Sequence, residues 1–109
     1  MTKISSAGDK KKPLPDIDKV IHEPARLMIL ANLYVVERAD FIFLMRQTGL
    51  TQGNLSSHMS KLEAAGYIEI KKEFISKKPH TVLLLTNEGR AALKSYIRSM
   101  KQVFNGLAD

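Results

Sequence analysis

The sequence predicts a mainly helical α+β fold in which a two-stranded β-hairpin separates a group of short helices from a long C-terminal helix. Three patterns lead to this prediction. Apolar residues recur at helical spacing between residues 24 and 65, alternate with polar residues from 68 to 74, and return to helical spacing from 93 to 107. Because 109 residues have room for one apolar core, we expect one domain.

The N-terminal residues differ in character from the rest of the chain. Residues 1–13 are polar and contain three successive lysines, so we expect a flexible basic tail that precedes a domain over residues 14–109. The lysine run could be an arm on DNA, but we interpret it as a solvated tail. In residues 14–22, Ile17, Val20 and Ile21 are spaced by three and four, which predicts a short helix.

Two helices are predicted before the middle of the chain. Pro24 suits the first position of a helix, and residues 27–36 are almost continuously apolar, which favours a buried central helix. Residues 37–40 form a polar link. A third helix follows over about residues 41–48, with Phe41, Leu44 and Met45 on one face and Gly49 as its C-terminal cap.

The next helix is predicted over residues 51–65, with Thr51 as N-cap and Gly66 after its end. Leu55, Met59 and Leu62 share one side of it. The opposite side offers small or hydrogen-bonding side chains, with no acidic residue before Glu63. The sequence thus predicts a helix, a short turn and a second helix. The polar face of this second helix can enter a groove of DNA.

After Gly66 the period changes to two, because Ile68, Ile70 and Phe74 alternate with polar residues as in a half-buried strand. A second strand is predicted over residues 81–85, with residues 76–80 as the connection. We call this hairpin, residues 68–85, the wing. The final helix, about residues 86–107, is capped by Thr86 and would extend about 30 Å, so part of its apolar seam should project beyond its own core and be covered by a second subunit. The seam is Leu93, Tyr96, Ile97, Met100, Val103, Phe104 and Leu107.

Composition restricts the classes of function. The formal net charge of +6 and the isoelectric point near 9.7 favour a polyanionic partner. Cysteine is absent, which excludes disulfides and thiolate metal sites, and the three histidines lack paired spacing, so we expect no metal and no cofactor. No secretory signal or spanning segment is recognisable, and we therefore expect a cytoplasmic protein without membrane contact. No nucleophile with its base, and no phosphate-binding loop, can be placed, so we expect no enzyme activity.

Two stretches resemble a known family. Residues 49–68, Gly-Leu-Thr-Gln-Gly-Asn-Leu-Ser-Ser-His-Met-Ser-Lys-Leu-Glu-Ala-Ala-Gly-Tyr-Ile, are similar to the recognition helix and wing entry of the winged-helix regulators of the MarR and ArsR superfamily, in particular its short single-domain members. Residues 85–90, Leu-Thr-Asn-Glu-Gly-Arg, are similar to the family's junction between the wing and the dimer helix. The resemblance covers residues 14–105 and implies a winged helix-turn-helix transcription factor that binds DNA as a homodimer. The lack of cysteine departs from the thiolate metal-sensing branch of ArsR-like proteins. The short N-terminal region departs from the longer N-terminal helices of typical MarR proteins.

These observations predict a sequence-specific regulator of double-stranded DNA, expected to be a repressor, with helix 51–65 in the major groove and the wing on the backbone or minor groove. A small-molecule effector is left open. In the recognition helix the candidate contacts are Thr51, Gln52, Gly53, Asn54, Ser57, His58 and Lys61, with Gln52 and Asn54 as readers of bases. Candidates for the backbone or minor groove are Arg46, Lys71, Lys72, Lys77, Lys78 and His80.

Two other functions are compatible with the same fold. A winged helix can hold a protein partner, which would need an apolar patch on the recognition face, and Asn54, Ser57 and Lys61 argue against such a patch. Binding of RNA or single strands usually needs exposed aromatic side chains for stacking, and aromatic residues are 6% of this chain. The C-terminal seam could also fold back on its own domain instead of pairing with a second chain.

Overall fold

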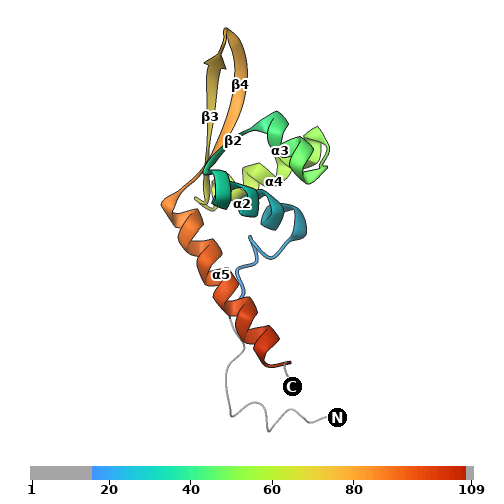
Figure 1. The fold of residues 1–109 in the computed structure, drawn as a ribbon, viewed down its shortest axis with the longest axis vertical. Coiled ribbons are helices and arrows are strands. Elements are labelled where there is room, and N and C mark those ends of the chain that lie inside the picture. Colours follow the sequence, from blue (N-terminus) through green and yellow to red (C-terminus); the bar gives the residue numbers. More distant parts are fainter. Residues whose placement is uncertain (1–15, 108–109) are drawn as a thin grey trace.

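The computed structural model describes residues 16–107, which form four α-helices and a three-stranded antiparallel sheet (Figure 1). The predicted tail, residues 1–13, lies outside the described residues. The molecule is elongated, 63 Å long and 26 Å across, because the wing and the C-terminal helix project in opposite directions. The elements are α2 (Pro24–Val36), β2 (Arg38–Asp40), α3 (Phe41–Thr48), α4 (Gln52–Ala64), β3 (Ile68–Ile75), β4 (Lys78–Leu85) and α5 (Asn87–Asn105).

Side-chain caps define where the helices begin. The Asp40 carboxylate accepts a hydrogen bond from the backbone N–H of Ile42 at the start of α3, and the Thr51 hydroxyl accepts one from Asn54 at the start of α4. Thr86 does the same for α5, and Gly49 ends α3 with a φ of 73°. The caps Gly49, Thr51 and Thr86 agree with the sequence prediction, whereas Asp40 was not predicted as a cap.

The sheet has the order β2-β4-β3, so the hairpin predicted from sequence is extended by a third strand. The prediction of residues 37–40 as a plain link was wrong: Ala39 pairs with Leu83, and Asp40 with Val82. A strand of three residues gives no detectable alternation, because only Ala39 turns towards the core. Its pairing partner lies more than forty residues further along the chain and becomes apparent only in three dimensions.

The wing is longer and tighter than predicted. Ile75 pairs with Lys78, so Ser76 and Lys77 alone form the turn, both with positive φ, and the predicted connection 76–80 was too long. Beyond Val82 the hairpin has no third strand beside it, and it rises free of the helices (Figure 1). Phe74 was expected to lie on a half-buried strand, but it is 79% exposed because it lies in this free part.

The core lies between α2, α4, the base of the sheet and the first half of α5. Helix α2 buries one face only, and the expectation that it is buried all round was wrong, since Met28, Val35 and Val36 are exposed. No helix within residues 16–107 is long and apolar enough to cross a membrane. The buried apolar side chains are Ile21, Ile29, Leu30, Leu33, Ala39, Leu44, Leu55, Leu62, Ile68, Val82, Leu83, Leu93 and Tyr96.

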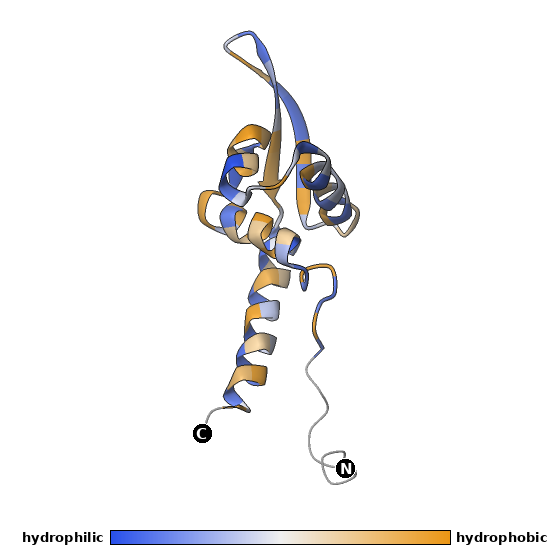
Figure 2. Ribbon diagram, turned by 90° about the vertical axis from the view of Figure 1, so that its right-hand side faces the viewer, coloured by the Kyte–Doolittle hydropathy of each residue, from blue (hydrophilic) through white to orange (hydrophobic). Residues whose placement is uncertain are grey.

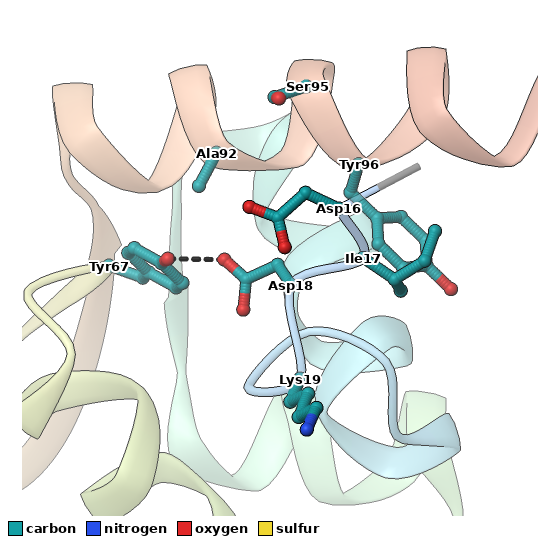
Figure 3. Close-up of a pocket in the computed structure, with 8 residues that line it drawn as sticks. All are labelled: Asp16, Ile17, Asp18, Lys19, Tyr67, Ala92, Ser95 and Tyr96. Atoms are coloured by element: carbon teal, nitrogen blue, oxygen red, sulfur yellow. Dashed lines mark hydrogen bonds between the residues drawn. The ribbon is translucent and has the colours of Figure 1, made fainter. Parts of the chain in front are cut away.

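Residues 16–22 do not form the predicted helix. The Asp18 carboxylate accepts hydrogen bonds from the backbone N–H groups of Val20 and Ile21, which closes a turn in place of a helix. Ile21 is nevertheless fully buried. The other Asp18 oxygen accepts a hydrogen bond from the Tyr67 hydroxyl beside α5 (Figure 3), so this segment joins the wing entry to the body.

Helix α5 has two parts with different surroundings. Leu93 and Tyr96, which we predicted to be part of a dimer seam, are buried in the core of their own domain. The reason is that α2 and residues 16–22 cover this half of the helix; the Tyr96 hydroxyl lies 2.9 Å from His22 Nδ1. The second half projects beyond the body and leaves Ile97, Val103 and Phe104 exposed (Figures 1 and 2), and Leu107, just past the end of the helix at Asn105, is exposed too.

Candidate nucleic-acid interface

The outward face of α4 consists of polar and small residues. Leu55 and Leu62 anchor the opposite face in the core, which fixes the orientation of the helix. None of the large apolar side chains that are exposed in residues 16–107 belongs to α4. The exposed predicted contacts on this helix and its cap are Thr51, Gln52, Gly53, Asn54, Ser57 and Lys61.

The first turn of α4 is built to donate hydrogen bonds. The Thr51 hydroxyl accepts from the Asn54 backbone N–H at 3.2 Å, which leaves its own O–H free to donate. The side-chain amides of Gln52 and Asn54 are exposed and can each donate and accept, as bidentate recognition of adenine requires. No acidic residue occupies this turn, so the positive end of the helix dipole is not neutralised.

The wing carries exposed lysines on both faces. Side chains alternate along a strand, so Lys71 and Lys72 point to opposite faces of β3, while Lys77 occupies the turn and Lys78 begins β4. Within residues 16–107 these four lysines, Arg46 and Lys61 have no carboxylate within 4.0 Å, since the ion pairs there involve other cations. Their charge is available to a polyanion.

An acidic residue of the wing is neutralised within the fold. Glu73 Oε1 lies 2.7 Å from Arg38 Nη2, which reaches across from β2. The third strand, which the sequence did not reveal, thus removes a negative charge from among the lysines. Figure 1 shows α3 and α4 beside the base of the wing, so the recognition helix and the lysine-rich hairpin belong to one end of the molecule.

The predicted contact His80 has a partner inside the protein. Its Nδ1 lies 2.6 Å from Asp40 Oδ1, and the other oxygen of Asp40 caps α3. Burial opposes ionisation of Asp40, but the hydrogen bonds from His80 and from the backbone of Ile42 outweigh it and lower the pKa of the carboxyl. The ring of His80 therefore joins the wing to the first helix of the pair.

His58 also turns towards the protein. Its Nδ1 lies 3.2 Å from Arg26 Nη1 and 3.8 Å from Glu23 Oε1, at the N-terminus of α2. The hydrogen bond from the Arg26 backbone is the main reason why the pKa of Glu23 is below its usual value. Arg26 Nε in turn donates to the carbonyl of Val20. Spacing alone could not reveal this cluster, because its members lie in three separate segments.

A second surface lies at the other end of the molecule, between α2 and the exposed half of α5. It is an apolar groove of about 530 Å³. Met100 lies in it half-buried, and Phe104 at its end is 59% exposed. The groove is lined by Leu27, Met28, Ala31, Tyr34, Leu93, Tyr96, Ile97, Met100, Lys101 and Phe104.

Comparisons with known proteins find a matching family and a relative. The model of a family described as a winged helix DNA-binding domain matches residues 25–104. An uncharacterized protein of Methanocaldococcus jannaschii is 40% identical over 85 residues, which are 78% of this chain and 92% of that protein. The family match includes the helix pair, the wing and most of α5.

Solved structures show the same fold. The transcriptional regulator homologue protein from Pyrococcus horikoshii OT3 is 33% identical, with a TM-score of 0.78 over 83% of this chain and 89% of that one. BpsR of Bordetella bronchiseptica, whose DNA binding is regulated by 6-hydroxynicotinic acid, has a TM-score of 0.66 over 83% of this chain and 67% of that one. It is 16% identical, so this second likeness concerns the fold alone.

Proposed function

Because the chain belongs to the family of winged-helix DNA-binding domains, as a transcriptional regulator of that type, we propose that it binds double-stranded DNA sequence-specifically as a homodimeric repressor. The observation that carries this proposal is the pairing of two surfaces at one end of the molecule. The hydrogen-bonding face of α4 lies beside a wing whose lysines have no acidic partner in the described chain. Acting on chromosomal DNA, the protein would work in the cytoplasm.

In the proposed complex α4 enters the major groove, where each base pair displays its own pattern of donors and acceptors. Gln52 and Asn54 read bases, Thr51 and Ser57 donate to phosphate or base edges, and Gly53 lets the groove wall approach the helix. Phosphates along the backbone or minor groove are held by Arg46, Lys61, Lys71, Lys72, Lys77 and Lys78. His58 orients α4 through its contact with Arg26, and His80 orients the wing through its contact with Asp40.

Binding to DNA is tested first with random-sequence duplex across a salt series. We expect log affinity to fall linearly with log salt, with a slope near −0.9 for each phosphate neutralised. A preferred sequence is then selected from the pool. Absence of binding at low salt would refute the proposal and leave recognition of a protein as the function of the fold.

Base reading is tested with Asn54→Ala. The cap of α4 uses the Asn54 backbone and not its amide, so the helix should remain intact. We expect affinity for the selected sequence to fall about 5- to 150-fold, the loss of one bidentate contact worth ~1–3 kcal/mol, with affinity for random duplex unchanged. Asn32→Ala, which removes a half-buried side-chain amide that donates to the carbonyl of Met28 on α2, is the matched control.

The homodimer is proposed on the exposed half of α5 and the α2–α5 groove. Ile97, Phe104 and Leu107 are 40%, 59% and 79% exposed, and a second copy of the helix would bury these apolar side chains. Phe104→Asp should therefore yield monomers by light scattering, whereas Arg98→Ala on the same helix should not. A wild-type monomer at micromolar concentration would refute this part and leave the groove to a small apolar ligand.

Repression follows if the dimer covers DNA that the transcription machinery must occupy. The test is a reporter gene placed downstream of the selected sequence. Expression should fall when the protein is present and recover with Asn54→Ala. An increase in expression would show activation instead.

A further inference from the structure

The outer part of the wing has an apolar surface that the body of the protein does not cover. Phe74 is 79% exposed and Ile75 is 44% exposed. Phe74 pairs directly with Pro79 across the hairpin, so their side chains stand together on one face. Figure 2 shows this apolar stretch close to the wing tip, away from every helix. Since neither residue supports the core, their exposure needs another reason.

The surroundings of Phe74 indicate the chemistry of what it meets. Lys72 lies two residues before it on the same face of β3, Lys77 occupies the adjacent turn, and Lys78 is paired with Ile75. The two carboxylates at the level of the next residue pair are both engaged, Glu73 by Arg38 and Asp40 by His80. An apolar tip bordered by unpaired lysines suits a partner that has anionic edges and a stackable interior, and duplex DNA has both.

We propose that Phe74, supported by Pro79, is a wedge that enters the minor groove, partly unstacks one base step and bends the duplex. The lysines hold the phosphates on the two sides of the step. Phe, Ile and Pro are residue types that such wedges use, and the bend lets the duplex contact more protein. This inference deepens the proposed function and rests on it, because it concerns how the same interface meets DNA.

The wedge also adds a source of specificity. Pyrimidine–purine steps such as TA and CA are unstacked most easily, so the sequence beneath the wing should favour them without any hydrogen bond to a base. Selection from a random pool should then show such a step outside the segment that α4 reads.

The experiment uses the duplex that the wild-type protein selects, labelled at its two ends for energy transfer. Wild-type protein should shorten the end-to-end distance. Phe74→Ala should abolish the bend and weaken binding about tenfold, the range expected for losing one stacking contact, while the salt slope stays unchanged because no charge is lost. Phe74→Leu should retain part of the bend. Val35→Ala, which shortens an apolar side chain that is 80% exposed on α2, should behave as wild type.

The outcomes separate the wedge from the proposed function. If Phe74→Ala binds and bends the duplex as wild type does, or if wild-type protein leaves the duplex straight, the wedge is refuted while DNA binding stands. If the affinity falls but the bend persists, Phe74 is an ordinary contact and the wedge is again refuted. If wild-type protein selects no duplex at all, both proposals fail. Thermal midpoints of all variants show whether the fold is intact.

Discussion

Gly89 lies against the carbonyl oxygen of Tyr67 so closely that a Cβ at position 89 would be 2.1 Å from that oxygen. The same oxygen accepts a hydrogen bond from the backbone N–H of Thr86 at 3.1 Å. The Thr86 hydroxyl donates to the carbonyl of Gly66 at 2.7 Å and accepts from Gly89 at 2.9 Å. The start of α5 is thus fastened to the entry of the wing.

Replacing Gly89 by alanine should destabilise the protein. The added Cβ would collide with the backbone oxygen of Tyr67. This oxygen accepts the hydrogen bond from Thr86, so it cannot move away without breaking that bond. We expect a loss of about 1–3 kcal/mol in the free energy of unfolding, measured by urea denaturation. An unchanged midpoint would show that α5 can shift away from the wing at little cost.

Tyr67 should make stability depend on alkaline pH. Its hydrogen bond to Asp18, together with burial and the nearby charges of Asp18 and Glu88, raises the pKa of the phenol to about 12. Because the folded pKa lies above the ordinary value of 10.0, the neutral phenol stabilises the fold below pH 10, and this contribution is lost as the pH rises towards 12. Tyr67→Phe should lower stability at pH 8 by about 1 kcal/mol and flatten this decline.

The titration itself can be followed by tyrosinate absorbance. The chain has three tyrosines, and the phase near pH 12 should disappear in Tyr67→Phe. Persistence of that phase in the variant would assign it to another tyrosine and contradict the prediction.

Local patterns predicted most of this fold. Thr51, Gly49 and Thr86 mark helix ends through hydrogen bonds to neighbours within four residues, and such signals are visible in sequence. The candidate contacts on α4 were recognisable for the same reason, since helical periodicity separates the buried Leu55 from the exposed Asn54. What could be predicted depended on short-range geometry.

The features that were missed depend on partners far apart in the chain. Strand β2 is held by pairing with β4, and the ring of His58 is drawn inward by Arg26 of α2. Leu93 continues the spacing of the apolar residues at the exposed end of α5. Periodicity therefore could not distinguish the apolar residues that their own domain covers from those that stay exposed. Phe74 continues the alternation of apolar and polar residues along β3, but within residues 16–107 no other part of the protein covers the strand at this position.

Asp40 should contribute to loss of stability in acid. Its folded pKa lies below the usual 3.8, so the carboxylate stabilises the fold above about pH 4 and this contribution disappears as the pH falls through the folded pKa. Asparagine can still cap α3 but cannot ionise. Asp40→Asn should therefore show a shallower decline in unfolding free energy between about pH 4 and pH 2. Equal slopes for both proteins would mean that the pairing with His80 and the cap do not favour ionisation.

Lys77 is best removed by glycine and not by alanine. Its φ of 66° is a conformation that side chains disfavour and glycine adopts freely, so Lys77→Gly deletes the charge without weakening the turn. We expect unchanged or higher stability, weaker binding to every duplex, and a salt slope smaller by about one. Lys77→Arg should keep the wild-type slope. An unchanged slope in Lys77→Gly would remove this residue from the phosphate contacts.

Gly53 distinguishes stability from binding most sharply. A Cβ at this exposed position of α4 would meet nothing within 4 Å, so the fold gives no reason for glycine, which costs a helix up to ~1 kcal/mol relative to alanine. If the wall of the major groove lies against this position, the added methyl group must push it away. We therefore expect Gly53→Ala to raise the thermal midpoint slightly and to weaken binding to the selected duplex several-fold. Higher stability with undiminished affinity would show that DNA does not approach α4 at residue 53. Helix α4 would then have to be oriented differently in the groove, with Gln52, Asn54 and Ser57 facing the bases and Gly53 turned away from the groove wall.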